Sequence, residues 1–133
     1  MKMTTAEVLT VTTGRMLCSV DRLYATLNFL TRDNLYTHQL GRALEEVRPW
    51  LCRWFPWSAN VDTAGLDLAL GGVEDADRMR ACIEWVTHEA ESRGWPASVS
   101  VEPILRDDHE VIDPLAELVS MTAAPIVIVL PAE

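Results

Sequence analysis

The sequence predicts an α+β fold, a single domain over residues 1–133 in which about four strands are covered by about four helices, in the order β-α-α-β-α-β-α-β. Two kinds of pattern support this prediction. Stretches with apolar residues three and four positions apart are typical of amphipathic helices. Short runs that are rich in β-branched residues, or that alternate apolar and polar positions, are typical of strands. A chain of 133 residues is long enough to bury one hydrophobic core.

Four stretches have the pattern of strands. Glu7–Thr13 is rich in valine and threonine and ends at Gly14. Gly65–Leu70 carries leucine at every second position, and valines alternate with polar residues in Ser98–Glu102. Pro125–Leu130 is an uninterrupted apolar run, which is typical of a strand that is buried on both faces.

The strongest helical pattern lies in Thr37–Pro56, around which the rest of the chain is expected to pack. Thr37 is expected to cap this helix and Pro49 to kink it, because proline removes an amide donor and crowds the preceding turn. A shorter helix is predicted to begin at the cap Ser19 and to end near Thr31. The apolar face of the main helix is predicted to consist of Leu40, Leu44, Val47, Leu51 and Trp54.

Two more helices are predicted in the second half. The turn Gly71-Gly72 introduces a helix that ends at Gly94, and its first turn carries carboxylates that suit the positive end of the helix dipole. Asp113-Pro114 has the pattern of a helix start, a capping residue followed by proline. The predicted core-facing residues are Met79, Cys82, Ile83, Val86 and Ala90 in the first of these helices, and Leu115, Leu118 and Val119 in the second.

Charge is distributed unevenly between the two halves of the chain. Residues 1–61 carry a net charge of +2, whereas residues 62–133 carry −11, which gives −9 for the whole protein. Such acidity would repel a phosphate backbone, so direct nucleic-acid binding is not expected. It would attract a basic protein surface instead, although acidity alone can also simply maintain solubility.

Neither composition nor motifs indicate a membrane protein or a cofactor enzyme. No apolar run approaches the length needed to cross a bilayer, and the N-terminus lacks the pattern of a secretion signal. The three cysteines, Cys18, Cys52 and Cys82, form no CxxC pair and are expected to be reduced, structural thiols in a cytoplasmic protein. No catalytic signature is recognisable among the cysteines, serines and histidines, so we expect a protein that is not an enzyme, and we expect no cofactor and no metal.

Two patterns could carry chemistry and are weighed against simpler explanations. The loop with Asp107, Asp108, His109, Glu110 and Asp113 offers oxygen and imidazole donors to a cation, but its spacing does not match an EF-hand loop and the chain has no HExxH helix, so a solvated loop is favoured. Arg15 and His38 are polar residues of the basic half that could serve a small enzyme or ligand-binding domain near the tryptophan cluster, residues 50–57. A surface arginine at a turn is the favoured interpretation of Arg15.

Two segments resemble a known group of proteins. LTVTTGRMLC, from Leu9 to Cys18, and THQLGRALEEVRPWL, from Thr37 to Leu51, are similar to a family of small uncharacterised proteins of phages and prophages. The resemblance covers roughly residues 1–56. Because the family has no established activity, it implies only a context: small acidic phage proteins often bind and disable a host protein.

The resulting hypothesis is a non-enzymatic, phage-encoded interaction protein that inhibits a host defence system such as CRISPR. It would act in the cytoplasm of the host cell by binding a host protein with a basic surface, and a homodimer remains open. The alternatives are a small enzyme or ligand-binding domain that uses Arg15 and His38, and a virion structural or assembly protein that associates through the 125–130 run or the tryptophan cluster. The predicted partner-binding residues are Asp75, Asp77, Asp107, Asp108, Glu110, Trp57 and Trp95.

Overall fold

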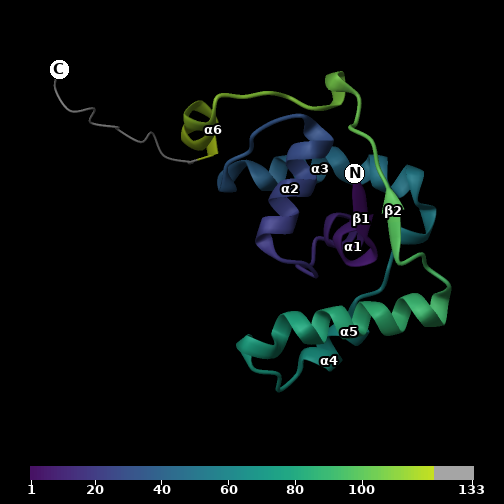
Figure 1. The fold of residues 1–133 in the computed structure, drawn as a ribbon. Helices are drawn as coiled ribbons and strands as arrows, with labels where there is room; N and C mark the ends of the chain where they lie inside the picture. Colours follow the sequence, from purple (N-terminus) through teal and green to yellow (C-terminus); the bar gives the residue numbers. More distant parts are fainter. Residues whose placement is uncertain (122–133) are drawn as a thin grey trace.

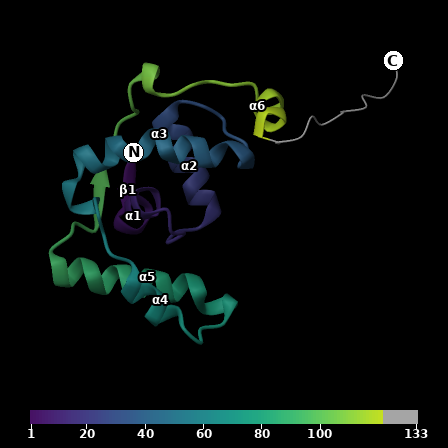
Figure 2. The ribbon, with the colours of Figure 1, turned by 180° about the vertical axis from the view of Figure 1, so that it is seen from behind.

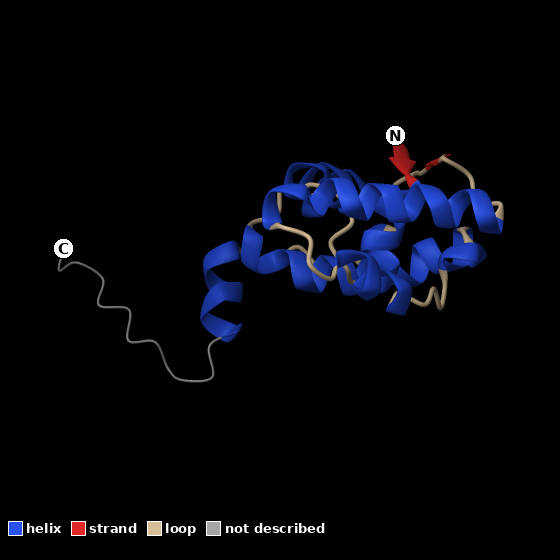
Figure 3. Ribbon diagram, turned by 90° about the horizontal axis from the view of Figure 1, so that it is seen from below, coloured by secondary structure: helices blue, strands red, loops and turns tan. Residues whose placement is uncertain are grey.

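The computed structural model describes residues 1–121, and this part of the chain is mostly helical (Figures 1 and 3). Helix α1 lies in the middle, with α2 and α3 on one side of it and α4 and α5 on the other. In chain order the elements are β1 (Lys2–Thr4), α1 (Thr5–Thr13), α2 (Val20–Thr31), the 3-10 helix η1 (Thr37–Gln39), α3 (Leu40–Trp54), η2 (Pro56–Ser58), α4 (Ala64–Leu70), α5 (Asp75–Arg93), β2 (Ser98–Ser100), η3 (Arg106–Asp108) and α6 (Pro114–Met121).

The predicted α+β fold with about four strands is wrong. Within residues 1–121 the only sheet has two short antiparallel strands, in which Met3 of β1 pairs with Val99 of β2. Strand β2 confirms the strand predicted at Ser98–Glu102, although it is shorter, and its partner is the unpredicted β1. The stretches Glu7–Thr13 and Gly65–Leu70 belong to helices α1 and α4. The strand predicted at Pro125–Leu130 lies outside the described residues.

Helix α1 forms in spite of its β-branched residues because both of its ends are capped. The Thr4 hydroxyl accepts a hydrogen bond from the Glu7 amide, and the Glu7 carboxylate accepts one from the Thr4 amide, which together make a capping box. Gly14 closes the helix with a φ of 77°, a left-handed conformation that glycine adopts without a steric penalty. The Arg48 guanidinium of α3 donates a hydrogen bond to the Val11 carbonyl near the same end.

Helix α4 shows a second way in which a strand-like pattern can mislead. Leu66 and Leu70 are buried, whereas Leu68 between them is 85% exposed. The two buried leucines are therefore four residues apart and not two. Four residues is the spacing along one helical face. Asp62 supports the first turn by accepting a hydrogen bond from the Ala64 amide.

The predicted helices of the other segments are confirmed, with changes in detail. Ser19 caps α2, Gly94 ends α5 in a left-handed conformation, and Asp113 accepts a hydrogen bond from the Ala116 amide at the start of α6. Thr37 does not cap the main helix α3: it begins η1, and the residue that precedes α3 is Gln39. Pro49 lies inside α3, as predicted.

Two hydrophobic clusters flank α1. Val8 and Val11 face the first cluster, which α1 forms with α2, α3 and the segment after β2. Leu9 faces the second cluster, which is formed with α4 and α5. Because α1 is apolar on both sides, it is buried nearly all round, and so its sequence shows no single apolar stripe. Figures 1 and 2 show the same central place for α1 from front and back.

Two predicted core faces turn out to be exposed. In α6, Leu115 and Leu118 are 58% and 42% exposed, and the buried residue of this helix is instead Glu117. In α5, Cys82 and Val86 are buried as predicted, but Ile83 is 49% exposed. The inward positions of α6 and part of the α5 stripe were therefore predicted wrongly, because periodicity locates an apolar face without showing what covers it.

Candidate functional site

The described residues form a groove between α1 and α5, hereafter the α1–α5 groove. It has a cavity volume of about 520 Å³, within the usual range for binding sites. One wall is the N-terminal part of α1 with the loop that leads to α2, and the other is the face of α5 that carries Met79, Ile83 and Ala90. Met79 and Ile83 remain 36% and 49% exposed. The groove therefore offers apolar surface to an outside molecule.

The α1–α5 groove also has polar lining residues. On the α1 side, Arg22 donates hydrogen bonds to both oxygens of the buried Glu7 carboxylate, at 3.0 and 3.2 Å. On the α5 side, Glu91 lines the groove. Burial raises the pKa of the Cys18 thiol, which lines the groove, so this thiol stays protonated and is a poor nucleophile. These groups can position a ligand, but they do not form a nucleophile–base pair.

The acidic residues predicted as partner contacts fall into two separate groups. Asp75 and Asp77 lie exposed in the first turn of α5, where Asp77 pairs with Arg80 at 2.6 Å. Asp107, Asp108 and Glu110 lie exposed in and after η3. Figures 1 and 2 both place α5 and the η3 segment at opposite ends of the molecule. These acids therefore do not form one continuous patch.

The two predicted aromatic contacts are half-buried and not free on the surface. Trp57 and Trp95 pack against each other with ring centroids 5.6 Å apart, and both pack against the second hydrophobic cluster. Arg93 lies over the Trp95 ring at 5.6 Å from its centroid. Trp95 also lines the α1–α5 groove. In this arrangement the two rings join the end of α3 to the end of α5.

Arg15 and His38 are held by different parts of the structure. Arg15 pairs with Asp67 of α4, and this hydrogen-bonded pair lowers the pKa of the Asp67 carboxyl. His38 donates from Nε2 to the carbonyl of Pro114, 2.6 Å away, at the start of α6. The structure does not bring the two side chains together into one site.

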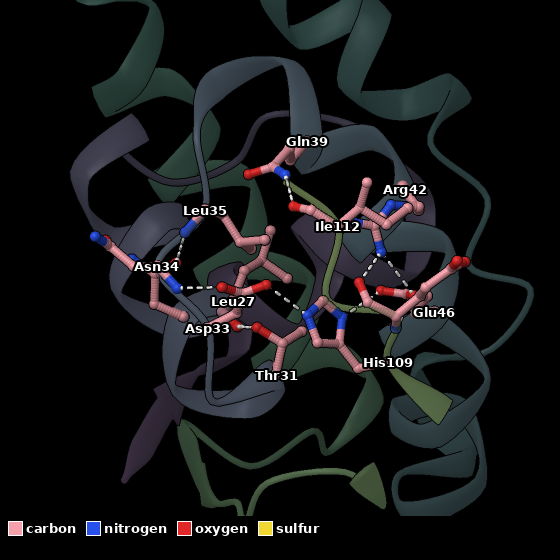
Figure 4. A network of polar contacts seen from close by, with 12 residues as sticks. Leu27, Thr31, Asp33, Asn34, Leu35, Gln39, Arg42, Glu46, His109 and Ile112 are labelled. Atoms are coloured by element: carbon pink, nitrogen blue, oxygen red, sulfur yellow. Dashed lines mark hydrogen bonds and ion pairs between the residues drawn. The ribbon is translucent and has the colours of Figure 1, made fainter. Parts of the chain in front are cut away.

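A buried polar network, hereafter the clasp, fastens residues 105–121 to α3 (Figure 4). The Arg42 guanidinium donates two hydrogen bonds to the Glu117 carboxylate, at 2.6 and 2.9 Å, and Gln39 donates a third at 2.9 Å. Arg42 also donates to Glu46 at 3.0 Å. Paired hydrogen bonds of this kind are strong and fix geometry, so they orient α6.

His109 forms the other half of the clasp. Its Nδ1 lies 2.6 Å from Glu46, and its Nε2 lies 2.8 Å from Asp33, while the His109 side chain is only 2% exposed. Both ring nitrogens thus lie within hydrogen-bond distance of a carboxylate oxygen. His109 is consequently held from both sides by structural contacts. Residues 1–121 contain no group of three or more His, Cys, Asp and Glu side chains suited to a metal ion.

The clasp was missed by the sequence analysis. None of Arg42, Glu46 and Glu117 was singled out there. The sequence of α6 did contain a usable signal. Its apolar residues are compatible with more than one inward face, and the Glu117 carboxylate can point inward if another part of the chain supplies a cation. That cation lies 75 residues earlier in the chain, beyond the reach of local patterns.

The clasp predicts a loss of α6 docking in acid. The hydrogen bonds from Arg42, followed by the one from Gln39, lower the pKa of Glu117 from 4.5 to about 2. The carboxylate therefore stabilises the docked form fully above pH 4.5, and this stabilisation is lost progressively as the pH falls towards 2. Amide hydrogen exchange of α6 across this range should show the decline.

The matched control for this prediction is Glu117→Gln, which cannot titrate. The difference in α6 protection between the native protein and this variant should shrink between pH 4.5 and pH 2. An unchanged difference over this range would contradict the assigned role of Glu117.

The described residues form a small, mostly helical domain with an apolar groove, in which a charged clasp holds the C-terminal part of the described chain. Residues 3–61 are similar to a family described as a domain of unknown function (DUF7736). That match includes α1, α2 and α3 and the clasp residues Asp33, Gln39, Arg42 and Glu46, but not α5 or α6. Comparison with curated proteins finds no match, nor does comparison with solved structures. Within residues 1–121, no helix combines the length and apolar character needed to span a bilayer.

Proposed function

We propose that this protein is a non-enzymatic interaction module that binds a basic protein surface through its acidic second half. The observation that carries the proposal is the number of exposed carboxylates after residue 61 that have no cationic partner in the described structure. Such uncompensated charge attracts basic surfaces and accelerates their association. These residues are Asp62 before α4, Glu74, Asp75, Glu84 and Glu91 on or beside α5, and Glu102, Asp107, Asp108, Glu110 and Asp113 before α6.

The arrangement of ion pairs supports a binding role over a purely solubilising one. Arg15, Arg42 and Arg22 are each already paired with an acid, so their charge is not available to balance the acids that have no cationic partner. The two groups of acids, on α5 and before α6, therefore produce a negative potential, and none of these three arginines lies among them. A partner would meet one group at a time, because the groups lie at opposite ends.

The proposal predicts salt-sensitive binding that depends on the acids. Reversing Asp75, Asp77, Asp107, Asp108 and Glu110 to lysine should weaken affinity for a basic partner by about tenfold or more, and should flatten the dependence of Kd on salt. Titration calorimetry at two salt concentrations would measure both effects on a partner purified by affinity capture. Reversal of two subsets, Asp75 with Asp77 and the other three together, would show which group is used.

A matched control is Glu45→Lys, which reverses an exposed acid in the basic half. Its affinity should stay close to that of the native protein. An unchanged affinity in the five-residue variant would contradict the proposal, as would equal losses in the variant and the control.

A finer form of the proposal rests on the resemblance of residues 1–56 to phage and prophage proteins. On that basis we propose that the basic partner belongs to a host defence system, such as a CRISPR nuclease, and that binding occurs in the host cytoplasm. Expression of the protein in a CRISPR-protected host should then restore plaque formation by a targeted phage. Plaque numbers that remain as low as without the protein would contradict this finer form while leaving the binding module intact.

The two alternatives receive less support. A ligand-binding domain centred on Arg15 and His38 would need them in one site, whereas Arg15 contacts α4 and His38 contacts the start of α6. A virion assembly role would use the 125–130 run, which lies outside the described residues, or the tryptophan cluster, whose rings are partly buried against the first hydrophobic cluster. Neither alternative supplies a site that the described structure assembles.

A further inference from the structure

The outer wall of the α1–α5 groove is an amphipathic strip of α5. Met79, Ile83 and Ala90 line the groove from successive turns, and both Met79 and Ile83 are partly exposed. From Met79 to Ala90 the helix rises by about 16 Å, so this strip is about three turns long. A surface of this length and width suits the apolar face of another helix, which inserts side chains at intervals of three and four residues.

Among the charged side chains beside this strip, those without an ion pair are acidic, because Arg22, which lines the groove, pairs with Glu7. Glu84 and Glu91 are seven residues apart, so they lie on the same side of α5 and next to the residues that line the groove. Both are exposed, and neither forms an ion pair with another residue in the described part of the chain. The nearby cations are engaged: Arg80 pairs with Asp77, and Arg93 pairs with Glu89. A partner lying along the strip would therefore meet unneutralised carboxylates at a two-turn spacing.

We infer that the α1–α5 groove binds a basic amphipathic helix of a partner protein, with its apolar face against Met79 and Ile83 and with Lys or Arg side chains opposite Glu84 and Glu91. This inference rests on the proposed function, because it names the partner segment that the acidic half would recognise. Apolar contact in the groove supplies affinity, and the flanking carboxylates select a basic helix over an acidic one.

The probe for this inference is a fluorescent amphipathic peptide of about 18 residues with leucine on one face and lysine on the other. Its binding is followed by fluorescence anisotropy. Ile83→Glu should weaken binding by about tenfold or more, because it places a charge against the apolar face of the peptide. Glu84→Gln with Glu91→Gln should weaken binding less and reduce its dependence on salt.

Two controls separate the groove from general acidity. Leu68→Glu changes an apolar residue of α4 that is 85% exposed and does not line the groove, so binding should persist. Asp107→Asn with Glu110→Gln removes as much charge as the Glu84 and Glu91 variant, at the other end of the molecule, and should also leave binding intact. Circular dichroism of each variant confirms that the helices remain folded.

Several results would overturn the inference. Unchanged peptide binding by Ile83→Glu would do so, as would equal binding of a peptide whose lysines are replaced by glutamate. A dimeric mass in solution that Ile83→Glu converts to a monomer would show that a second copy occupies the groove instead. If only the Asp107 and Glu110 variant loses the peptide, the groove inference fails and the proposed function stands. If neither the peptide nor any basic protein binds, both fail.

Discussion

Arg42→Ala is expected to release residues 105–121 from α3. The substitution leaves the Glu117 carboxylate, which is 4% exposed, without the two hydrogen bonds and the positive charge that hold it. Removing one partner of a buried ion pair usually costs about 3–5 kcal/mol. We expect about 3 kcal/mol, the lower end of that range, because the Arg42 side chain is 19% exposed and its loss admits some water.

This loss should be local. No described residue after Ile104 belongs to either hydrophobic cluster, so the clasp is the main attachment of α6. Hydrogen exchange should therefore show lost protection of the α6 amides, such as that of Glu117, while the amides of α1 and α3 keep most of theirs.

Arg93→Ala is the matched control for Arg42→Ala. Arg93 also pairs with a glutamate, Glu89, but its side chain is 53% exposed, and such surface pairs contribute about 0.5 kcal/mol or less. Arg42→Lys should give an intermediate result, because an ammonium group keeps the charge but cannot make the paired contact. Full α6 protection in Arg42→Ala would refute the clasp.

Leu9→Ala is expected to be the most damaging of the simple core substitutions. Leu9 is fully buried and is the α1 residue that packs against the cluster formed by α4 and α5. Truncation of such a leucine removes buried apolar surface and leaves a cavity, at a cost of about 2–5 kcal/mol. The free energy of unfolding, measured by urea denaturation, should fall by about 3 kcal/mol.

Leu68→Ala provides the corresponding control, since Leu68 is 85% exposed in α4. Its effect on the free energy of unfolding should stay within about 0.5 kcal/mol. If α1 were instead the strand that the sequence suggests, Leu9 would not be held between α4 and α5. Equal, small effects of the two substitutions would therefore contradict the central place of α1.

Helices with clear end signals could be predicted from the sequence, whereas α1 and the short α4 could not. Helix α5 has strong end signals in its first-turn acids and in Gly94, and α2 has the cap Ser19. Helix α1 is buried on both sides, so its residues follow no single period and its valines and threonines favour the prediction of a strand. The missed signal is the capping-box pattern from Thr4 to Glu7.

The candidate site could be predicted from the sequence only in part, because it too depends on contacts between distant segments. The acidity of the second half is a property of composition and could be predicted, as could the positions of Met79 and Ile83 on an apolar face. Whether that face is covered depends on α1, which lies far away in the chain. The clasp likewise joins Arg42 to Glu117 and Asp33 to His109, pairs that only the folded chain brings together.

The most direct test of the account is to map where a basic amphipathic peptide contacts the protein. Amide chemical shifts recorded by NMR during titration with the leucine–lysine peptide report on each residue separately. If the peptide binds in the α1–α5 groove, we expect the largest shift changes along Met79–Glu91 of α5 and at the start of α1, with little change in residues 105–113. Changes concentrated in residues 105–113, or no saturable change in the α1–α5 groove, would contradict it.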